Sequence, residues 1–310
     1  MLIPYLNGIV WFAKAPMTWL LFFMNFFVFI YFMNNQNNVQ NQMRTYFEKN
    51  AFVANQGILY SQFIRKNPAS FSPLLQTMSK SIYVDTDSKA KIMGQLAFRD
   101  ALFMEKGTKE NYSGDQVAVE NWKDNVRQIA SIQKRSASFQ YGLSHEHSGP
   151  MNWLTYQFMH ADWTHLMANM FFLLIFGAAL EPVVGSGMMA LIYFVAGVAA
   201  AYSFSLLSGF AAVPLIGASG SISGLMGLFA GVFKNRPVKF FYWLLPRPNY
   251  VGFLFLPAWV ALAMWSLLDL GGLLGSVEEL GGTAHAAHLG GALFGLVIGL
   301  VLFRGSKATA

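Results

Sequence analysis

Two apolar stretches decide the fold of this chain, because each carries a polar residue that a membrane core accepts only at a cost. Residues 215–233 read LIGASGSISGLMGLFAGVF and residues 284–303 read AHAAHLGGALFGLVIGLVLF. Each has the length and composition of a transmembrane helix. A nucleophilic or ionisable side chain at membrane depth favours a functional role, so Ser219 and His288 are predicted to be partners. A serine facing a histidine supplies the nucleophile and the general base that nucleophilic acyl transfer requires.

The composition indicates a membrane protein with one polar insertion. The 310 residues are 55% hydrophobic and 12% charged, against roughly 25% charged in an average soluble domain. Residues 33–150 hold 14 of the 21 Lys and Arg and 10 of the 15 Asp and Glu. With the charges mixed in this way, the net charge of +6 favours contact with anionic lipid headgroups rather than with nucleic acid. The chain has no cysteine, which excludes a disulfide framework and a Cys-ligated metal site.

Six stretches are apolar enough to predict membrane spans, and together they indicate an all-α bundle of six transmembrane helices. They cover residues 16–33, 153–180, 188–207, 215–233, 250–270 and 284–303. The chain then divides into the N-terminus with the first span (1–33), a large insertion (34–152), the core of spans two to six (153–304) and a short tail (305–310).

Basic residues in the short segments predict the orientation of the bundle. With six spans these residues share one side: Lys14, Lys234, Arg236, Lys239, Arg247, Arg304 and Lys307. Cytoplasmic loops carry an excess of Lys and Arg, so both termini are expected in the cytoplasm and residues 34–152 outside. The loop between spans five and six carries only acids, Glu278 and Glu279, as expected outside. The compact plan without a transit peptide favours a bacterial plasma membrane.

The insertion is predicted to be mostly helical. Residues 43–65, 88–106 and 116–140 repeat apolar side chains at intervals of three and four. These helices fit either a small helical domain or amphipathic helices that lie on the outer leaflet.

Glycine spacing predicts that spans four and six pack together. Glycines lie at 217, 220, 224, 227 and 231 in span four and at 291, 295 and 299 in span six. Stripes of small residues let membrane helices approach closely, and such an approach brings Ser219 within reach of His288. Ser221 and Ser223 are alternative nucleophiles, but Ser219 begins the span, where backbone N–H groups point at a developing oxyanion.

Four histidines allow a second interpretation, in which the chain binds or transports a metal. His285 precedes His288 by three residues, and His160 and His165 lie in span two. The absence of cysteine and of an HExxH helix argues against zinc. His165 and Asn169 share a helical face and fit either interhelical hydrogen bonds or side-chain donors to an oxyanion. No Asp or Glu lies near His288 in sequence, so a dyad is predicted, and Glu181 is expected to be structural.

Taken together, these residues resemble the rhomboid family of intramembrane serine proteases. The resemblance covers about residues 153–303 and rests on His160-x4-His165-x3-Asn169, Gly217-Ala218-Ser219-Gly220 and Ala287-His288-x2-Gly291.

The resemblance implies a role for each matched residue. Ser219 is implied as nucleophile and His288 as general base, with an oxyanion hole from His165, Asn169 and the backbone at Gly217 and Ser219. His160 and Glu181 are implied to be structural residues near the site, with Glu181 bracing the loop between the first two spans, and His285 is expected to help orient His288. No cofactor is expected.

The predicted function is hydrolysis of peptide bonds in or near the transmembrane segment of single-span membrane proteins. Two alternatives stay open. The first is a rhomboid-like pseudoenzyme that binds membrane clients without cutting them. The second is a metal transporter that uses the histidines.

Overall fold

The computed structural model describes residues 2–4, 14–48, 50–81, 86–144, 146–208, 213–234, 237–243, 251–274 and 284–303. Six of the residues used to predict the orientation lie outside these ranges: Arg236, Arg247, Glu278, Glu279, Arg304 and Lys307.

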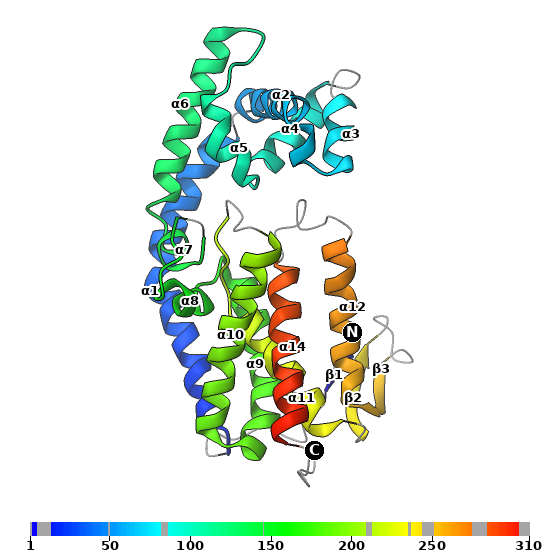
Figure 1. Cartoon of the computed structure of the whole chain (residues 1–310). Helices are drawn as coiled ribbons and strands as arrows, with labels where there is room; N and C mark the ends of the chain where they lie inside the picture. The colour runs from blue at the N-terminus through cyan, green and yellow to red at the C-terminus, as the bar shows by residue number, and fades with distance from the viewer. Residues whose placement is uncertain are drawn as a thin grey trace.

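Six apolar helices form the lower part of the molecule as Figure 1 draws it. They are α1 (Pro16–Phe47), α9 (Trp163–Val184), α10 (Ser186–Ser208), α11 (Ser219–Phe233), α12 (Trp259–Leu274) and α14 (His285–Leu302). Four of the described helices, α1, α9, α10 and α14, are long and apolar enough to cross a membrane. The 15 residues of α11 and the 16 of α12 span only about 22–24 Å at 1.5 Å per residue, against a hydrocarbon core of about 30 Å.

Spans two and four begin later as helices than the sequence predicts. The stretch predicted from residue 153 opens with the short α8 (Asn152–Thr155) and η4 (Tyr156–Phe158), and α9 starts only at Trp163. Asp162 caps α9, since its carboxylate accepts the backbone N–H of His165 at 2.8 Å. Residues 215–218 likewise precede α11 without being helical. The two helices that carry His165, Asn169 and Ser219 therefore begin close to these residues.

The prediction of an all-α fold is wrong at one end of the bundle. A three-stranded antiparallel sheet joins β1 (Leu2–Pro4), β2 (Pro237–Trp243) and β3 (Val251–Pro257) in that order. Span five was predicted from residue 250, but its first part is β3, and α12 begins at Trp259. A short apolar run suits a strand as well as a helix, and this one carries two phenylalanines, which explains the error.

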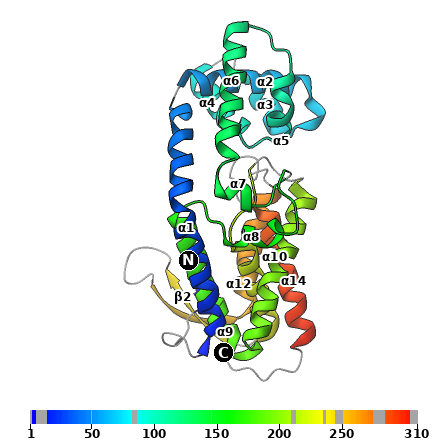
Figure 2. The ribbon, with the colours of Figure 1, turned by 90° about the vertical axis from the view of Figure 1, so that its left-hand side faces the viewer.

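The insertion is helical, as predicted, and its first helices, α2 to α5, form a separate layer beyond the end of the bundle opposite the sheet, while α6 runs back alongside α1 to α7 (Figures 1 and 2). It begins later than residue 34, because α1 continues without a break to Phe47. The remaining elements are α2 (Asn50–Lys66), η2 (Pro68–Ser70), α3 (Pro73–Ser81), α4 (Thr86–Ala97), α5 (Ala101–Lys106), η3 (Gly107–Lys109), α6 (Gln116–Gln133) and α7 (Ala137–Tyr141).

The insertion has a hydrophobic core of its own, distinct from that of the bundle. Its largest buried side chains include Tyr60, Phe63 and Trp122, whose rings each contact the ring of Phe103. Of the two arrangements left open by the sequence, this core favours a small helical domain over separate helices on a leaflet.

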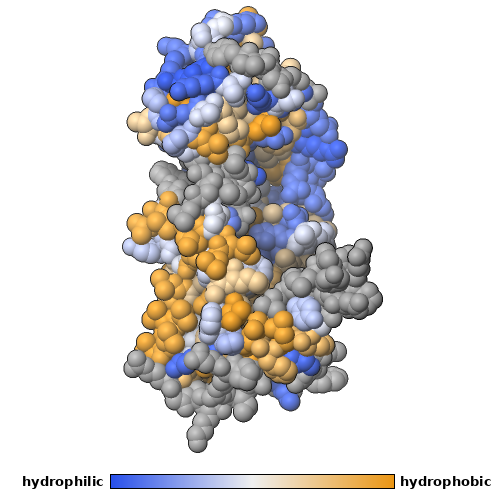
Figure 3. Space-filling view, turned by 90° about the vertical axis from the view of Figure 1, so that its right-hand side faces the viewer, coloured by the Kyte–Doolittle hydropathy of each residue, from blue (hydrophilic) through white to orange (hydrophobic). Residues whose placement is uncertain are grey.

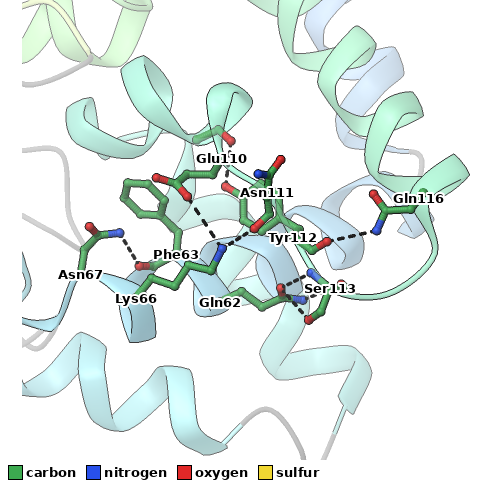
Figure 4. Close-up of polar contacts among 10 residues, drawn as sticks. Gln62, Phe63, Lys66, Asn67, Glu110, Asn111, Tyr112, Ser113 and Gln116 are labelled. Carbon is green, nitrogen blue, oxygen red and sulfur yellow. Dashed lines mark hydrogen bonds and ion pairs between the residues drawn. The ribbon is translucent and has the colours of Figure 1, made fainter.

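Polar contacts tie the segment before α6 to α2 at the surface of this layer (Figure 4). Lys66 donates to the carbonyl of Asn111 and lies 3.7 Å from the Glu110 carboxylate. The side-chain oxygen of Gln62 accepts both the backbone N–H and the hydroxyl of Ser113, each at 3.1 Å. These groups are exposed, so they position the segment more than they stabilise it.

The packing of α11 against α14 confirms the prediction from the glycine stripes. A Cβ built on Gly227 would lie closer than 3.0 Å to the carbonyl oxygen of Ala292, and one on Gly291 equally close to that of Gly220. The two backbones are therefore in direct contact, as small residues in membrane helices allow. This contact fixes the relative height of Ser219 and His288.

The outer surface of the bundle is apolar, in contrast to the insertion. In Figure 3, orange side chains cover much of the lower part of the visible face, whereas blue gathers at the top. On α14 the exposed side chains include Leu293, Val297 and Val301, which are 63%, 49% and 61% exposed. A water-soluble monomer rarely exposes so much contiguous apolar surface. The bundle is suited to lipid.

The family resemblance implied that Glu181 lies near Ser219 and His288. Instead, Glu181 caps α1 at the opposite end of the bundle. Its carboxylate accepts the backbone N–H groups of Met17 and Thr18 at 2.8 and 2.7 Å, and the hydroxyls of Thr18 and Ser186 at 2.7 and 2.6 Å. The first N–H groups of a helix lack intrahelical partners and attract negative charge. The buried carboxylate satisfies them, so it holds α1 rather than the loop between the first two spans.

Candidate active site

Ser219 and His288 are in hydrogen-bonding contact. The Oγ atom of Ser219 lies 2.9 Å from Nε2 of His288, as the packing of spans four and six predicts. Ser219 is the first residue of α11 and His288 lies in the first turn of α14. Both are half-buried at the end of the bundle that faces the insertion. This distance is the one that proton transfer between a hydroxyl and an imidazole requires.

The prediction that no acid accompanies His288 is wrong. Oδ1 of Asp269, on α12, lies 3.0 Å from Nδ1 of His288. The same oxygen lies 2.8 Å from Nδ1 of His285. Asp269 precedes His288 by 19 residues, so sequence proximity missed it, but an aspartate inside a predicted span was itself a signal of function.

His165 presents a hydrogen-bond donor to the loop that precedes Ser219. Its Nδ1 accepts the backbone N–H of Ala161 at 3.4 Å, which leaves the proton on Nε2. A Cβ built on Gly217 would lie 2.8 Å from that Nε2 and 3.7 Å from Nδ2 of Asn169. The structure thus brings both predicted side-chain donors to one place, two residues before Ser219.

Gly217 is required at this place for its shape rather than for its N–H group. It was predicted to contribute to an oxyanion hole, but its backbone N–H donates to the carbonyl of Tyr156 at 2.9 Å. Its φ is +114°, a conformation that favours glycine. Because it has no Cβ, the His165 imidazole can approach the backbone, so its contribution is to make room.

The remaining predicted histidines occupy two separate places. His160 is fully buried, its Nδ1 lies 3.3 Å from the carbonyl of Phe158, and its ring centroid is 5.1 Å from that of His165. His285 joins His288 at Asp269 instead. The ligand atoms of Asp269, His285 and His288 all lie within 4.8 Å of one another. Among the residues that the structure describes, these are the one set of three or more His, Cys, Asp or Glu side chains whose spacing could hold a metal ion.

The alternative serine nearest to Ser219 has another partner. The hydroxyl of Ser221, which is fully buried, donates to Oε1 of Gln157 at 2.9 Å. Gln157 was not singled out in the sequence, and the same holds for Tyr156, whose hydroxyl donates to the carbonyl of Gly197 at 2.7 Å. Both residues lie in η4, just before α9. Through Gln157 and the carbonyl of Tyr156, η4 is hydrogen-bonded to Ser221 and Gly217 at the start of α11.

Comparison with known proteins places the chain in a family. A model of the Rhomboid domain matches residues 147–305, about half of the chain. The chain belongs to the rhomboid family, and it is an integral membrane protein.

Two curated relatives carry the family name. The mitochondrial "Rhomboid protein 1" of Saccharomyces cerevisiae is 31% identical over 147 residues, which are 46% of this chain and 39% of the relative. The chloroplastic "Rhomboid-like protein 11" of Arabidopsis thaliana is 31% identical over 170 residues, 54% of this chain and 58% of the relative. The chain thus covers less than two thirds of either relative.

Proposed function

We propose that this protein is an intramembrane serine protease in which Ser219 is the nucleophile and His288 the general base. The observation that carries the proposal is the 2.9 Å contact between Oγ of Ser219 and Nε2 of His288. Membership of the rhomboid family supports it.

The chemistry follows from the positions of these groups. As Oγ of Ser219 attacks the carbonyl carbon of a peptide bond, Nε2 of His288 takes the hydroxyl proton. His288 then returns that proton to the departing amine. Water hydrolyses the resulting ester, with His288 again accepting a proton, and free serine is restored.

The oxyanion is held by donors that surround the beginning of α11. We assign this role to Nε2–H of His165, the side-chain amide of Asn169 and the backbone N–H of Ser219. The side-chain donors lie beside Gly217, and the N–H groups of the first helical turn have no intrahelical acceptor. Such fixed donors stabilise developing charge because they need no reorganisation.

The substrates we propose are single-span membrane proteins, cut in or near their transmembrane segment. The site lies at one end of an apolar bundle, so an extended segment that leaves the bilayer meets Ser219 there. We further propose that α11 and α12 cross the membrane with the other four helices. The sheet, which contains Lys239 and follows Lys234, then faces the cytoplasm, and the insertion lies outside. We propose a bacterial plasma membrane as the location.

The alternative of a pseudoenzyme that only binds clients has less support. A protein without peptidase activity has no need for a serine held in hydrogen-bonding contact with a histidine. The two candidates differ in one measurable property, the reactivity of Ser219.

The test is labelling of the detergent-solubilised protein with a fluorescent fluorophosphonate, which reacts with activated serines. The wild type should label, and Ser219→Ala and His288→Ala should not. Ser221→Ala is the matched control, since it removes a hydroxyl two residues away on the same helix and should still label. Wild-type labelling of the Ser219→Ala variant would refute the assignment.

A further inference from the structure

We infer that Asp269 is a positioning residue for His288, so that the site works as a Ser219–His288–Asp269 triad. The inference rests on the proposed function and deepens it. It adds an acid from α12, which none of the three sequence motifs contains.

The first argument concerns the tautomer of His288. A carboxylate only accepts hydrogen bonds, so the 3.0 Å contact between Asp269 Oδ1 and His288 Nδ1 places the proton on Nδ1. Nε2 is then unprotonated and accepts the hydroxyl of Ser219 at 2.9 Å. Without the carboxylate, a neutral imidazole can also adopt the opposite tautomer, with the proton on Nε2. With a proton on Nε2, His288 is unable to take one from Ser219.

The second argument concerns charge. When His288 accepts the proton of Ser219 it becomes an imidazolium, and the adjacent carboxylate stabilises that charge. The side chains of His288 and Asp269 are only 19% and 15% exposed, so water screens the pair poorly. The stabilisation exists only while the imidazolium does, so it lowers the barrier instead of strengthening substrate binding.

Asp269 could instead only hold α12 and α14 together, and His285 provides the control for that structural role. Its Nδ1 lies 2.8 Å from the same Oδ1, and a carboxylate oxygen has lone pairs for both histidines. The two contacts join the same pair of helices, α12 and α14. Only the one to His288 leads on to Ser219. If Asp269 merely ties the helices together, losing His285 should matter as much as losing Asp269.

The experiment measures the reaction of the full-length protein in detergent with a fluorophosphonate, with the maximal rate of inactivation, kinact, separated from the binding constant, KI. We expect Asp269→Asn to lower kinact by about 10²–10⁴-fold with little change in KI. We expect His285→Gln to lower kinact far less than Asp269→Asn does, even if both variants lower the Tm by similar amounts.

A second pair of variants tests the role of the charge at nearly constant size. Asp269→Glu keeps a carboxylate and Asp269→Gln does not, so the Glu variant should react faster. If Asp269→Asn does not fold, this comparison shows whether the reaction needs the negative charge at position 269.

Each outcome has one meaning. Equal losses of kinact in Asp269→Asn and His285→Gln, or no loss in Asp269→Asn, overturn the triad while the protease assignment stands. A wild type that does not react at all overturns both.

Discussion

Gly295 of α14 lies directly against the carbonyl oxygen of Gly224 in α11, so that a Cβ on Gly295 would lie closer than 3.0 Å to it. The neighbour is backbone and has no side chain to move aside. We therefore expect Gly295→Ala to destabilise the bundle by about 1–3 kcal/mol, the usual cost of overpacking. A lower Tm in detergent, followed by intrinsic fluorescence, measures this.

Gly187 of α10 is the matched control for that substitution. It is also a helical glycine, but a Cβ there would meet no atom within 4 Å. Gly187→Ala should leave the Tm unchanged or raise it slightly, because alanine favours the helix. A Tm loss as large as that of Gly295→Ala would show that the helix contact is not the cause.

Gly217→Ala should lower activity by disturbing the oxyanion donors. The added methyl meets Nε2 of His165 at 2.8 Å, and the φ of +114° disfavours any L side chain. Since losing one oxyanion donor costs about 10²–10³-fold in rate, we expect a loss of that order in labelling rate. Asn169→Ala should give a similar loss without the backbone strain. A Gly217→Ala variant that labels at the wild-type rate contradicts the proposed position of the donors.

Glu181→Ala should destabilise the protein without removing the reactivity of the folded fraction. The buried carboxylate accepts two backbone N–H groups of α1, and hydrogen bonds to charged groups contribute about 1.5–3 kcal/mol. We expect a clear fall in Tm, with the labelling rate per folded molecule preserved.

Glu48→Ala serves as its control, because Glu48 pairs with Arg44 at an exposed surface of α1. Exposed pairs contribute little, so its Tm should match the wild type. An inactive but stable Glu181→Ala protein would mean that Glu181 acts on the site after all.

Chelation should leave serine labelling unchanged. Asp269, His285 and His288 have the spacing of metal ligands, but in the proposed protease both histidines are hydrogen-bonded to Asp269, and His288 is also hydrogen-bonded to Ser219. Labelling before and after treatment with EDTA tests this. A loss of labelling that zinc restores would favour the metal-binding interpretation of the histidines.

The sequence alone identified the site residues that can be recognised within a single segment. Ser219 and His288 each stand out within one apolar segment, and the glycine spacing alone predicts that their helices touch. The family resemblance followed from three short motifs, each contained in one span.

What the sequence left out depends on contacts between distant segments. Asp269 reaches His288 from another helix, and Glu181 reaches Met17 across 164 positions. Residues 251–257 satisfy a helical and a strand pattern equally well, and only the pairing with residues 237–243 makes them a strand. Periodicity along one segment contains none of this information.

The separate core of the insertion makes a last prediction, that it unfolds independently of the active site. Trp122 is 1% exposed in that core, and its indole N–H donates to Gln56 at 3.1 Å. Trp122→Ala should cost about 3–5 kcal/mol there, as for other buried aromatic residues. We expect faster proteolysis within residues 50–133, while the bundle still labels at Ser219. If labelling disappears together with the folded insertion, the insertion is needed to hold the site, and the independence of the two cores is refuted.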